Sequence, residues 1–548
     1  MTSDSRDFDY IIVGGGSAGC VLANRLSADP ALSVLLLEAG GSDRNPLFQM
    51  PAGFARMTKG VAAWGWNTVP QKHLDGRVIR FTQAKVIGGG SSINAQLYTR
   101  GNAKDYDSWA SDAGCEGWSY REVLPYFKRS EDNQKLVNAF HAYGGPLGVS
   151  WPVNPPPISH AFLRAAQELG IPFNEDFNGA VQEGMGHYQL STRDAMRSST
   201  ASAFLRPARQ RPNLTVRLKT QTLRLLIENH RACGVEVAGP TGPMQLRAKC
   251  EIILACGAIG SPRLLQLSGI GPADALRAAG IGVVHDLPGV GGNLQDHLDL
   301  YAISECTGEH TYDRIARPHR SLWAGLQYLL FKTGPVASTL FETGGFWYAD
   351  PQARSPDIQF HLGLGSGIEA GVEQMRNPGV TVNSAYLRPR SRGTVRLASA
   401  DPAHAPLIDP NYWSDPHDQQ MALEGLRLAR EILRQPALKP YVLAERLPGD
   451  GVRTKADLIA YAYRSCKTDH HPAGTCAMGA REDSVTTPQL TLRGIEGLRV
   501  ADASIMPFVP SCNTNAPTIM IAEKAADLIL GRAPPPPAEL PSNAIAGF

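Results

Sequence analysis

Three glycines near the start of the chain have the spacing of a dinucleotide-binding loop. They occur in Gly14-Gly15-Gly16-Ser17-Ala18-Gly19, directly after the apolar run 10–13 and before a segment of small residues that predicts a helix. In that setting Gly14 permits a tight turn, Gly16 lets the backbone approach a pyrophosphate, and Gly19 lets the helix pack close to the strand. The pyrophosphate would bind at the helix N-terminus, whose free N–H groups and dipole favour negative charge.

A carboxylate follows the second apolar run of the chain. Glu38, followed by Ala39, comes directly after the run 34–37. At this place in the motif a carboxylate accepts hydrogen bonds from ribose hydroxyls, and it disfavours the 2′-phosphate of NADP. The order of strand, turn, helix, strand and acid therefore favours a dinucleotide site over a glycine-rich surface turn.

Length and composition describe a large globular protein with no strong preference for charged partners. A chain of 548 residues exceeds what one hydrophobic core usually supports, so we expect two domains, which can be interleaved. The chain contains 43% hydrophobic and 19% charged residues, and its net charge is +2. These values are typical of ordinary soluble proteins, and because no block of lysine or arginine occurs we expect no nucleic-acid partner.

Three features of the sequence indicate the cellular location of the protein. No apolar run reaches ~18 residues, so we expect no transmembrane helix; the longest run, 322–331, is interrupted by Gln327 and predicts a packed helix. The dinucleotide motif begins by residue 8, which leaves no room for a secretory signal. The nine cysteines contain no C-x-x-C pair, which favours reduced thiols over disulfides or a zinc site. We therefore expect a cytoplasmic enzyme without a metal.

The elements that would position these residues change in character along the chain. Up to about residue 155, and again over 196–305, short apolar strands alternate with glycine-rich turns and helices, as in an α/β sheet. Residues 306–465 instead contain aromatic-rich strands, many prolines and an amphipathic helix over 417–434, which predicts a mixed sheet with helices. A final helix is expected over 518–530, and the proline run 534–537 predicts a stiff, disordered tail.

Five further motifs occur in order over almost the whole chain. Residues 84–94, with Gly88-Gly89-Gly90-Ser91-Ser92-Ile93-Asn94, and residues 257–271, which begin Gly-Ala-Ile-Gly-Ser-Pro, resemble the two signatures of the glucose–methanol–choline (GMC) oxidoreductases. The segments 290–297, 471–475 and 513–518 resemble other motifs of that family. The strongest resemblance is to its bacterial choline-dehydrogenase-like and alcohol-dehydrogenase-like members.

The resemblance implies a bound FAD, an alcohol as the donor, and transfer of a hydride to the flavin N5 atom. It also implies a Rossmann-like α/β FAD-binding domain built from the discontinuous segments 1–155, 196–305 and 466–533. An α+β substrate domain, with a mixed or antiparallel sheet and helices, would be inserted as the segments 156–195 and 306–465, and residues 534–548 would form a tail. Family members that bind FAD covalently carry a histidine where this chain has Ile93, so we expect non-covalent FAD.

The motifs also imply which residues contact FAD. Gly88–Ser91 would approach the pyrophosphate, Asn94–Leu97 the flavin ring, and Asp502-Ala503 the ribityl chain. With the first glycine loop and the final motif included, the expected FAD-binding residues are Gly14, Gly16, Ser17, Ala18, Gly19, Glu38, Ala39, Val86, Gly89, Gly90, Ser91, Asn94, Ala95, Gln96, Leu97, Asp502, Ala503, Asn515 and Ala516.

Alcohol oxidation also needs a base for the O–H proton, and histidine, whose ordinary pKa is about 6.5, suits that role. Of the adjacent His470 and His471, the resemblance selects His471, which precedes Pro472. Adjacent residues of an extended segment point to opposite sides, so we expect His470 to have a structural or pocket-wall role. The family's second catalytic position falls on Asn515, which would hold the substrate oxygen against His471; alternatively, Asn515 caps the last helix.

Phe341 and Glu342 lie in a stretch that resembles the choline dehydrogenases. A carboxylate beside aromatic rings can receive a quaternary ammonium group. A buried carboxylate bonded to neighbouring backbone is the more common arrangement, however. We therefore take Phe341, Glu342 and His470 as candidates for substrate contact only.

Three functions stay open at this point. The first is a dehydrogenase that passes electrons to a quinone or another carrier, the second an oxidase that uses dioxygen and releases peroxide, and the third a hydroxynitrile lyase in which FAD does no redox work. A nicotinamide-dependent dehydrogenase is disfavoured by the second glycine signature. Because the carboxylate of Asp469, close to the base in sequence, opposes the negative charge that dioxygen acquires, we expect a dehydrogenase with a non-oxygen acceptor.

Overall fold

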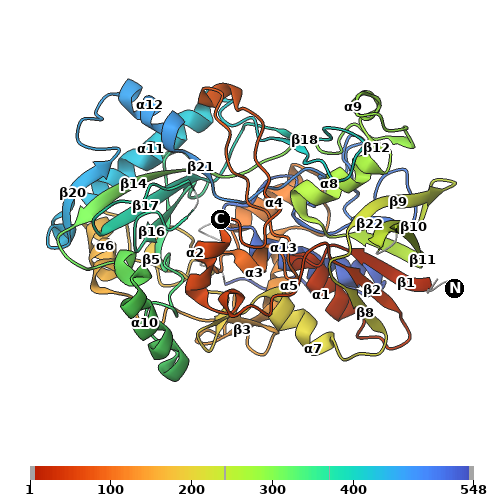
Figure 1. Ribbon diagram of the computed structural model, residues 1–548, viewed down its shortest axis with the longest axis horizontal. Helices are drawn as coiled ribbons and strands as arrows, with labels where there is room; N and C mark the ends of the chain where they lie inside the picture. Colours follow the sequence, from red (N-terminus) through yellow and green to blue (C-terminus); the bar gives the residue numbers. More distant parts are fainter. Residues whose placement is uncertain (1–6, 240–241, 370, 542–548) are drawn as a thin grey trace.

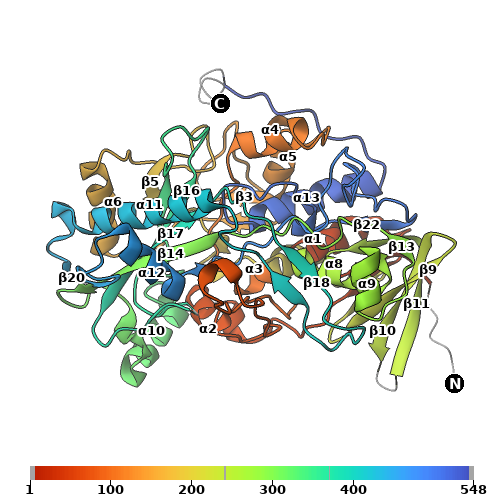
Figure 2. The same ribbon diagram turned by 90° about the horizontal axis from the view of Figure 1, so that it is seen from above.

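The protein is built on two large β-sheets that lie side by side (Figure 1, Figure 2). In this computed structural model, residues 7–239, 242–369 and 371–541 are described. The sheet on the right of Figure 1 is formed by strands within 7–254 and one strand at 498–500, and the sheet on the left by strands within 298–468 and one strand at 184–187. Each sheet has a separate hydrophobic core.

The first sheet is the expected α/β sheet. Its strands follow the order β8-β2-β1-β11-β10-β9, and β22 pairs with β11 off this path. β8, β2, β1, β11 and β22 are parallel, whereas β9 and β10 extend the sheet in antiparallel fashion. The strands are β1 (Asp7–Val13), β2 (Val34–Leu37), β8 (Leu214–Arg217), β9 (Thr222–Glu228), β10 (Arg231–Gly239), β11 (Gly242–Leu254) and β22 (Leu498–Val500).

The long strand β11 joins the two parts of this sheet. Residues 242–247 pair with β10, and residues 247–254 pair with β1. Because β1, β2, β11 and β22 are parallel, their carboxyl ends lie at one edge of the sheet, where Gly14, Glu38, Ala255 and Asp502 follow within two residues. This is the edge at which open α/β sheets bind ligands.

The second sheet is antiparallel and follows the order β20-β14-β17-β16-β15-β5, with β21 paired to β14. The helix α11 (Pro416–Leu433) packs on this sheet through its apolar face, as the sequence predicted. It begins at Asp415, whose side chain accepts the N–H of His417. The strands are β5 (Gly184–His187), β14 (Leu298–Cys306), β15 (Thr343–Trp347), β16 (Ile358–Gly363), β17 (Gly379–Tyr386), β20 (Val442–Leu447) and β21 (Lys467–Thr468).

Helices and small sheets complete the two layers. The first and last long helices, α1 (Ser17–Leu26) and α13 (Asn515–Ile529), pack against each other, and α5 packs against α13. The other helices are α2 (Phe54–Met57), α3 (Gly90–Ile93), α4 (Ala103–Ser111), α5 (Tyr120–Ser130), α6 (Pro157–Glu168), α7 (Arg206–Ala208), α8 (Gly257–Leu267), α9 (Ala273–Ala278), α10 (Pro318–Phe331) and α12 (Lys455–Ser465). Two-stranded sheets are formed by β3 (Glu131–Asn133) with β4 (Leu147–Val149), β6 (Thr192–Arg193) with β7 (Met196–Arg197), β12 (Ile270–Gly271) with β13 (His285–Asp286), and β18 (Thr394–Arg396) with β19 (Leu407–Asp409).

The strands support discontinuous domains but shift two of the expected boundaries. All strands of the first sheet come from the segments expected to bind FAD. However, β14, which the expected boundary at 305 assigned to the FAD domain, pairs with β17 in the second sheet, and β21 pairs with β14. We therefore propose that the substrate domain begins near Leu298 and ends after Thr468.

Two predictions for the surface were wrong. The apolar run 322–331, expected to be packed, lies in α10 with most of its large side chains exposed. The tail from 534, expected to be disordered, lies along the molecule as far as residue 541: the N–H of Ala538 donates to Arg121 O at 2.7 Å, and Leu540 packs against the first core. Residues 542–548 lie outside the described part. Within the described residues, none of the helices is long and apolar enough to cross a membrane.

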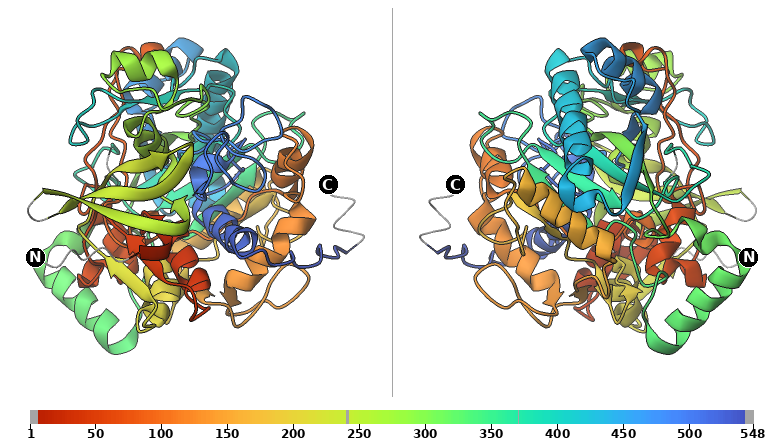
Figure 3. Two further views of the ribbon diagram at one scale, coloured as in Figure 1. Left: turned by 90° about the vertical axis from the view of Figure 1, so that its right-hand side faces the viewer. Right: turned by 90° about the vertical axis from the view of Figure 1, so that its left-hand side faces the viewer.

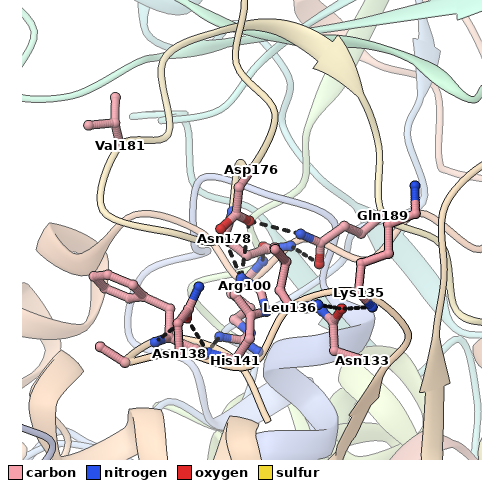
Figure 4. Close-up of polar contacts among 12 residues, drawn as sticks. Arg100, Asn133, Lys135, Leu136, Asn138, His141, Asp176, Asn178, Val181 and Gln189 are labelled. Atoms are coloured by element: carbon pink, nitrogen blue, oxygen red, sulfur yellow. Dashed lines mark hydrogen bonds and ion pairs between the residues drawn. The ribbon is translucent and has the colours of Figure 1, made fainter. Parts of the chain in front are cut away.

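A buried charged network ties three segments of the chain together (Figure 4). Arg100 binds Glu131 at 2.8 Å, and His141 bridges Glu131 and Asp176, each at 2.9 Å. Gln189 also donates to Asp176, at 2.8 Å. Arg100, Glu131 and His141 are at most 1% exposed. The network therefore anchors the segment that directly follows the expected flavin contacts at 94–97.

Candidate active site

A cavity of about 310 Å³ extends from the edge of the first sheet to the face of the second. At the first sheet it is lined by the residues that follow β1, β2, β11 and β22, including Gly14, Glu38, Ala255 and Asp502. At the second sheet its lining includes His361 of β16 and Asn383 of β17. The cavity therefore joins the two layers and contains the predicted dinucleotide site at one end.

The two glycine turns pack against each other at this edge. The Gly88 N–H donates to Gly15 O at 2.7 Å. A Cβ on Gly89 would lie 2.6 Å from Gly16 Cα, and one on Gly14 would lie 2.5 Å from Ala255 O. Gly14 and Gly89 also have positive φ angles, of 102° and 54°. Both turns therefore require glycine, and they leave the N-terminus of α1 open to the cavity, because no side chain caps it.

Two buried carboxylates flank the cavity next to the strand ends. Glu38 accepts the N–H groups of Gly15 at 2.8 Å and Gly40 at 2.6 Å. Asp502 accepts from Ser261 at 2.6 Å and from the Gly257 N–H at 2.9 Å, at the start of α8. Burial raises the pKa of both carboxyl groups, and their hydrogen bonds oppose this shift. Glu38 is thus in place to accept bonds from ribose hydroxyls.

Most of the expected FAD-binding residues line this cavity, as a bound FAD would require. They are Gly14, Gly16, Ser17, Ala18, Glu38, Ala39, Val86, Gly89, Gly90, Asn94, Ala95, Gln96, Leu97, Asp502, Ala503 and Asn515. Two uncapped helix N-termini, of α1 and α13, and glycine turns that a Cβ would fill are features that suit a pyrophosphate. The residues present therefore fit FAD.

Three of the expected FAD contacts do not line the cavity. Gly19 packs against Gly14, whose carbonyl oxygen would lie 1.9 Å from a Cβ at position 19, so Gly19 has the expected helix–strand packing role. The Ser91 hydroxyl donates to Gly88 O at 2.6 Å and so supports the second glycine turn. Ala516 is buried in the first core. These residues shape the site without facing it.

The sequence analysis missed several residues of the cavity wall. Thr220–Thr222 follow β8, and Cys256–Ala258 follow β11, so a rule that takes the residues after every parallel strand would have found them. Trp64 and Trp66 stack with ring centroids 4.9 Å apart and also line the cavity. The two tryptophans come from a loop in which no sequence pattern predicted a binding role.

His471 lies in the cavity wall, where Asp296 and His297 hold it. Its backbone N–H donates to Asp296 Oδ1 at 2.8 Å. Its ring stands edge-on to that of His297, and the two Nδ1 atoms are 3.0 Å apart. On the other side, His471 Nε2 lies 3.2 Å from Asn513 Nδ2. Both nitrogens of the imidazole therefore have a defined partner.

These partners determine which nitrogen of His471 carries the proton. The Leu387 carbonyl can only accept, so His297 Nε2, 3.1 Å away, must carry a hydrogen. In a neutral His297 the Nδ1 atom is then an acceptor, and His471 Nδ1–H must donate to it. Asn513 Oδ1 accepts from Thr99 at 2.9 Å and Gln359 at 3.0 Å, so its Nδ2 is the group that donates to His471 Nε2. The hydrogen bonds through His297 and those through Asn513 therefore both place the proton of His471 on Nδ1 and its lone pair on Nε2.

The electrostatic surroundings keep His471 neutral. Burial, as the main cause, lowers the pKa of His471 to about 4, and it lowers the pKa of His297 to about 3. Asp469 Oδ2 lies 3.6 Å from His471 Nδ1. Burial raises the pKa of Asp469, but positive charge nearby, including that of Lys467 at 3.7 Å, outweighs burial and lowers it, so that Asp469 is a carboxylate at neutral pH. His471 thus has the unprotonated nitrogen that a base requires and a carboxylate that would stabilise its charged form.

The expected pairing of His471 with Asn515 is not what the structure shows. Asn515 is the first residue of α13, and its Oδ1 accepts the hydroxyl of Ser17 at 2.8 Å, at the start of α1. The amide beside His471 belongs to Asn513. The two asparagines of Asn513-Thr514-Asn515 lie two positions apart, and the sequence alone does not show which of them lies beside His471. Asn515 is a contact of the expected pyrophosphate end, and we propose Asn513 as the catalytic amide.

Of the expected substrate residues, Phe341 and His470 line the cavity and Glu342 does not. Glu342 is 2% exposed, accepts the Thr339 N–H at 3.2 Å, and has its pKa raised to about 7 by burial. His470 faces the same cavity as His471 because its φ of 62° departs from an extended conformation. Glu369 also lines the cavity, and Lys467 binds it at 3.0 Å. Glu369 therefore already has a cationic partner, which it shares with Asp299 and Asp469.

Comparisons with known proteins agree with this site. Two family models, both described as GMC oxidoreductase, match residues 8–299 and 389–522. An alcohol dehydrogenase (acceptor) of Pseudomonas putida is 41% identical over 95% of this chain and 96% of its own length. The mitochondrial choline dehydrogenase of Homo sapiens is 42% identical over 97% of this chain and 91% of its own length.

Solved structures extend the similarity to the fold. Pyridoxine 4-oxidase from Mesorbium loti has a TM-score of 0.87 and 32% identity, and the match covers 96% of this chain and all of that one. A fungal aryl-alcohol oxidase has a TM-score of 0.84 and 25% identity, with 97% and 99% covered. The overall fold is thus shared with proteins that are named for redox reactions.

Proposed function

This chain belongs to the GMC oxidoreductase family, and on that basis we propose that it oxidises a neutral alcohol to an aldehyde or ketone with FAD. The observation that carries the proposal is the unprotonated Nε2 of His471, a residue of the cavity wall, which two independent hydrogen-bond chains leave as an acceptor. A hydroxynitrile lyase is not favoured, because the relatives and solved structures reported above are named for redox reactions.

FAD, when bound, supplies an acceptor for the hydride that leaves the carbinol carbon. Glu38 would hold the ribose, and the N-termini of α1 and α13 would hold the pyrophosphate. Residues 94–97, which line the same cavity, would contact the flavin ring. Ile93 also lines the cavity and has no nucleophile, so we propose that FAD is not covalently attached. Acid precipitation should then leave the yellow colour in the supernatant; colour in the pellet would contradict this.

The protein's own part in the reaction is to take the hydroxyl proton. An alcohol O–H directed at His471 Nε2 gives up its proton to that lone pair as the C–H bond breaks. Asn513 Nδ2, 3.2 Å from the same nitrogen, would donate to the alcohol oxygen and hold it against the base. The imidazolium that results keeps its Nδ1–H bond to His297 and gains the nearby charge of Asp469.

A neutral alcohol suits this cavity better than choline does. Glu342 lies outside the cavity lining, and the carboxylate of Glu369 is paired with Lys467. Of the carboxylates that line the substrate end, Asp469 also lies 3.7 Å from Lys467. A quaternary ammonium group would therefore share these two carboxylates with the ammonium of Lys467, and the repulsion between the two cations disfavours it.

We further propose a non-oxygen electron acceptor such as a quinone. Asp469, which also lines the cavity, places a negative charge 3.6 Å from the base, and this charge opposes the formation of superoxide next to it. The similarity to two oxidases supports the alternative, so the two must be separated by experiment.

The test is a panel of alcohols added to the holoenzyme without oxygen. Benzyl alcohol and a straight-chain primary alcohol should bleach the flavin with roughly tenfold higher kcat/KM than choline. A lysine that already holds the carboxylates should discriminate against a second cation by about 1.4 kcal/mol, about the size of one polar contact. Air is then admitted to the reduced enzyme. Slow reoxidation that a soluble quinone accelerates supports the dehydrogenase; reoxidation within milliseconds with stoichiometric peroxide identifies an oxidase.

A further inference from the structure

The helix α10 presents its apolar face to solvent. It projects from the edge of the second layer, as the green helix at the lower corner of both views in Figure 3. Leu322, Trp323, Leu329, Leu330 and Phe331 are 63–76% exposed, and Leu326 is 45% exposed. At 100° per residue, the side chains at 322, 323, 326, 329 and 330 lie within one stripe roughly a third of the helix circumference wide. A solvent-facing helix normally carries polar residues on that stripe.

The opposite face holds α10 in place. Ala324 and Tyr328 are its buried residues, and the Tyr328 hydroxyl donates to Ala195 O at 3.0 Å. The helix begins with Pro318 at its first position and ends at Lys332, which has the left-handed conformation of a helix stop. The buried face therefore fixes the position of α10 on the protein. The apolar stripe is exposed because this orientation turns it toward solvent.

Cationic side chains stand at both ends of the stripe. Arg317 and His319 are exposed at the start of α10, and Lys332 follows its last residue. Arg314 and Arg320 both bind Glu309 next to the start. From Glu309 to Lys332 the sequence contains four arginine or lysine residues and two carboxylates, so the segment is basic. An apolar stripe with tryptophan and flanking basic residues is the pattern of a helix that lies in a membrane interface.

We propose that α10 binds the protein to the surface of a membrane that contains anionic lipids. The helix would lie in the plane of the interface, with its apolar stripe among the acyl chains and with Arg317 and Lys332 at the phosphates. Its 14 residues give a length of about 21 Å at the usual rise per residue, too short to span a bilayer but sufficient for an interfacial anchor.

A second copy of the chain is a poorer occupant of this face. A two-fold pair of helices runs antiparallel or parallel, and because both ends of α10 are basic, a basic end of one helix would lie beside a basic end of the other in either arrangement. Like charges in contact disfavour such an interface. A single projecting helix also offers far less than the roughly 800 Å² per partner that a stable interface usually buries.

The anchor would also bring one wall of the active-site cavity toward the membrane. The loop that leaves α10 reaches Phe341, which lines the cavity, and on the way Val336 O accepts the N–H of Ala52, close to the cavity residue Phe54. If the proposed function holds, apolar alcohols and quinones dissolved in the bilayer would be near their site of use. Membrane binding itself does not depend on that function.

The test is flotation of the holoenzyme with vesicles of phosphatidylcholine, alone or mixed with phosphatidylglycerol. The wild type should float with the mixed vesicles. The triple variant Leu322→Gln, Trp323→Gln, Leu329→Gln keeps good helix formers, and its bound-to-free ratio should fall at least about tenfold. The pair Arg317→Glu, Lys332→Glu should reduce binding to the mixed vesicles to the level seen with phosphatidylcholine alone.

A matched control removes exposed apolar side chains elsewhere. Val137 and Tyr143, 72% and 77% exposed, lie in the loop between β3 and β4, and Val137→Gln, Tyr143→Gln should float like the wild type. All variants should retain FAD and be reduced by alcohol at the parental rate, which separates this test from that of the proposed function. A wild type that stays unbound with both vesicles, or a triple variant that floats normally, would overturn the proposal. So would a lipid-free dimer, detected by light scattering, that the triple variant converts to a monomer.

Discussion

At His471, neighbours on opposite sides of the imidazole ring decide where its lone pair points. Leu387 O fixes the tautomer of His297, and Thr99 and Gln359 fix the orientation of the Asn513 amide. The two chains of hydrogen bonds agree that Nε2 is the acceptor nitrogen of this cavity-wall residue. The base is therefore prepared before the substrate arrives, which avoids the cost of reorganising the site during the reaction.

The lowered pKa of His471 predicts the pH dependence of the reaction. Burial holds this pKa at about 4, and the base acts in its neutral form. The rate of anaerobic flavin reduction should therefore be constant from neutral pH to about pH 5 and should fall about tenfold per unit below the pKa. Stopped-flow measurements at saturating alcohol test this. A rate that falls around pH 6.5 would show that the pKa is not lowered.

The two asparagines of Asn513-Thr514-Asn515 should have separable roles. Asn513→Ala removes one hydrogen bond at the reacting oxygen, so the flavin reduction rate should fall roughly tenfold while FAD stays bound. Asn515→Ala instead removes the partner of Ser17 between α1 and α13, so flavin content should fall while the flavin that is retained is reduced at the parental rate. Measuring the flavin-to-protein ratio beside the rate distinguishes them. Exchanged effects would restore Asn515 as the partner of the base.

At the scale of elements, the parallel strands of the first sheet account for the position of the site. β1, β2, β11 and β22 end at one edge, and each is followed within two residues by a residue of the cavity wall. The two glycine turns then meet through backbone alone, since neither tolerates a Cβ. The dinucleotide end of the cavity is thus a consequence of strand order and of glycine at a few positions.

The contact between the glycine turns can be tested by replacing Gly89 with alanine, which adds one methyl group. In Gly89→Ala the new Cβ would lie 2.6 Å from Gly16 Cα at a φ of 54°, so the turns must separate. We expect the flavin content of the purified protein to fall several-fold, because the second glycine signature could no longer approach the first. Gly282→Ala, where a Cβ meets nothing within 4 Å, is the control and should retain its flavin. Full flavin content in both variants would contradict this role of Gly89.

The sequence predicted the elements better than it predicted their contacts. β2 was predicted at its observed bounds and α11 within a residue, because a buried parallel strand and an amphipathic helix each have a clear period. By contrast, β14 was placed in the wrong layer and α10 was taken for a packed helix. Pairing partners and orientation depend on residues far away in the chain, and an apolar stripe looks the same whether it faces a core or a membrane. The second catalytic position was assigned to Asn515 rather than Asn513 for a related reason. Which of the two side chains reaches His471 depends on how the chain enters α13.

At the scale of the whole molecule, the cavity exists because two layers meet, and the buried network around His141 helps to hold one of its walls. The Arg100–Glu131–His141–Asp176 network links the segment after residues 94–97 to two distant loops (Figure 4). Burial opposes the charging of His141, but the bonds to Asp176 and Glu131 raise its pKa overall. For Glu131, burial is outweighed by Arg100 and His141, and the pKa falls to about 2.

These shifts predict how stability depends on pH. Because folding raises the pKa of His141, protonated His141 adds to the free energy of unfolding. This contribution is complete below the pKa of about 6.5 in the unfolded chain and is lost as pH rises through the pKa in the folded protein. The lowered pKa of Glu131 stabilises the fold above about pH 4.5 and is lost as pH falls toward 2. The network is therefore most stabilising at mildly acidic pH.

His141→Gln should destabilise the protein by about 3 kcal/mol in that range, because it leaves buried carboxylate charge without its partner. The loss in melting temperature relative to the wild type should shrink as the pH rises through the raised pKa of His141, where the wild-type histidine gives up its proton. His404→Gln, at an exposed histidine, is the control and should leave the melting temperature unchanged at all pH values. A difference between wild type and His141→Gln that does not change with pH would contradict a charged His141.

The central claim is that His471 is the base for alcohol oxidation on FAD, and anaerobic flavin reduction tests it most directly. Wild type and His471→Ala, both with bound FAD, are mixed with a neutral primary alcohol in a stopped-flow spectrometer without oxygen. The wild-type flavin should bleach, and the variant should keep its flavin but bleach about 10²–10⁴-fold more slowly, the usual cost of losing a general base. A variant that bleaches at the parental rate would remove His471 from the mechanism, and a wild type whose flavin no alcohol bleaches would contradict the proposed function itself.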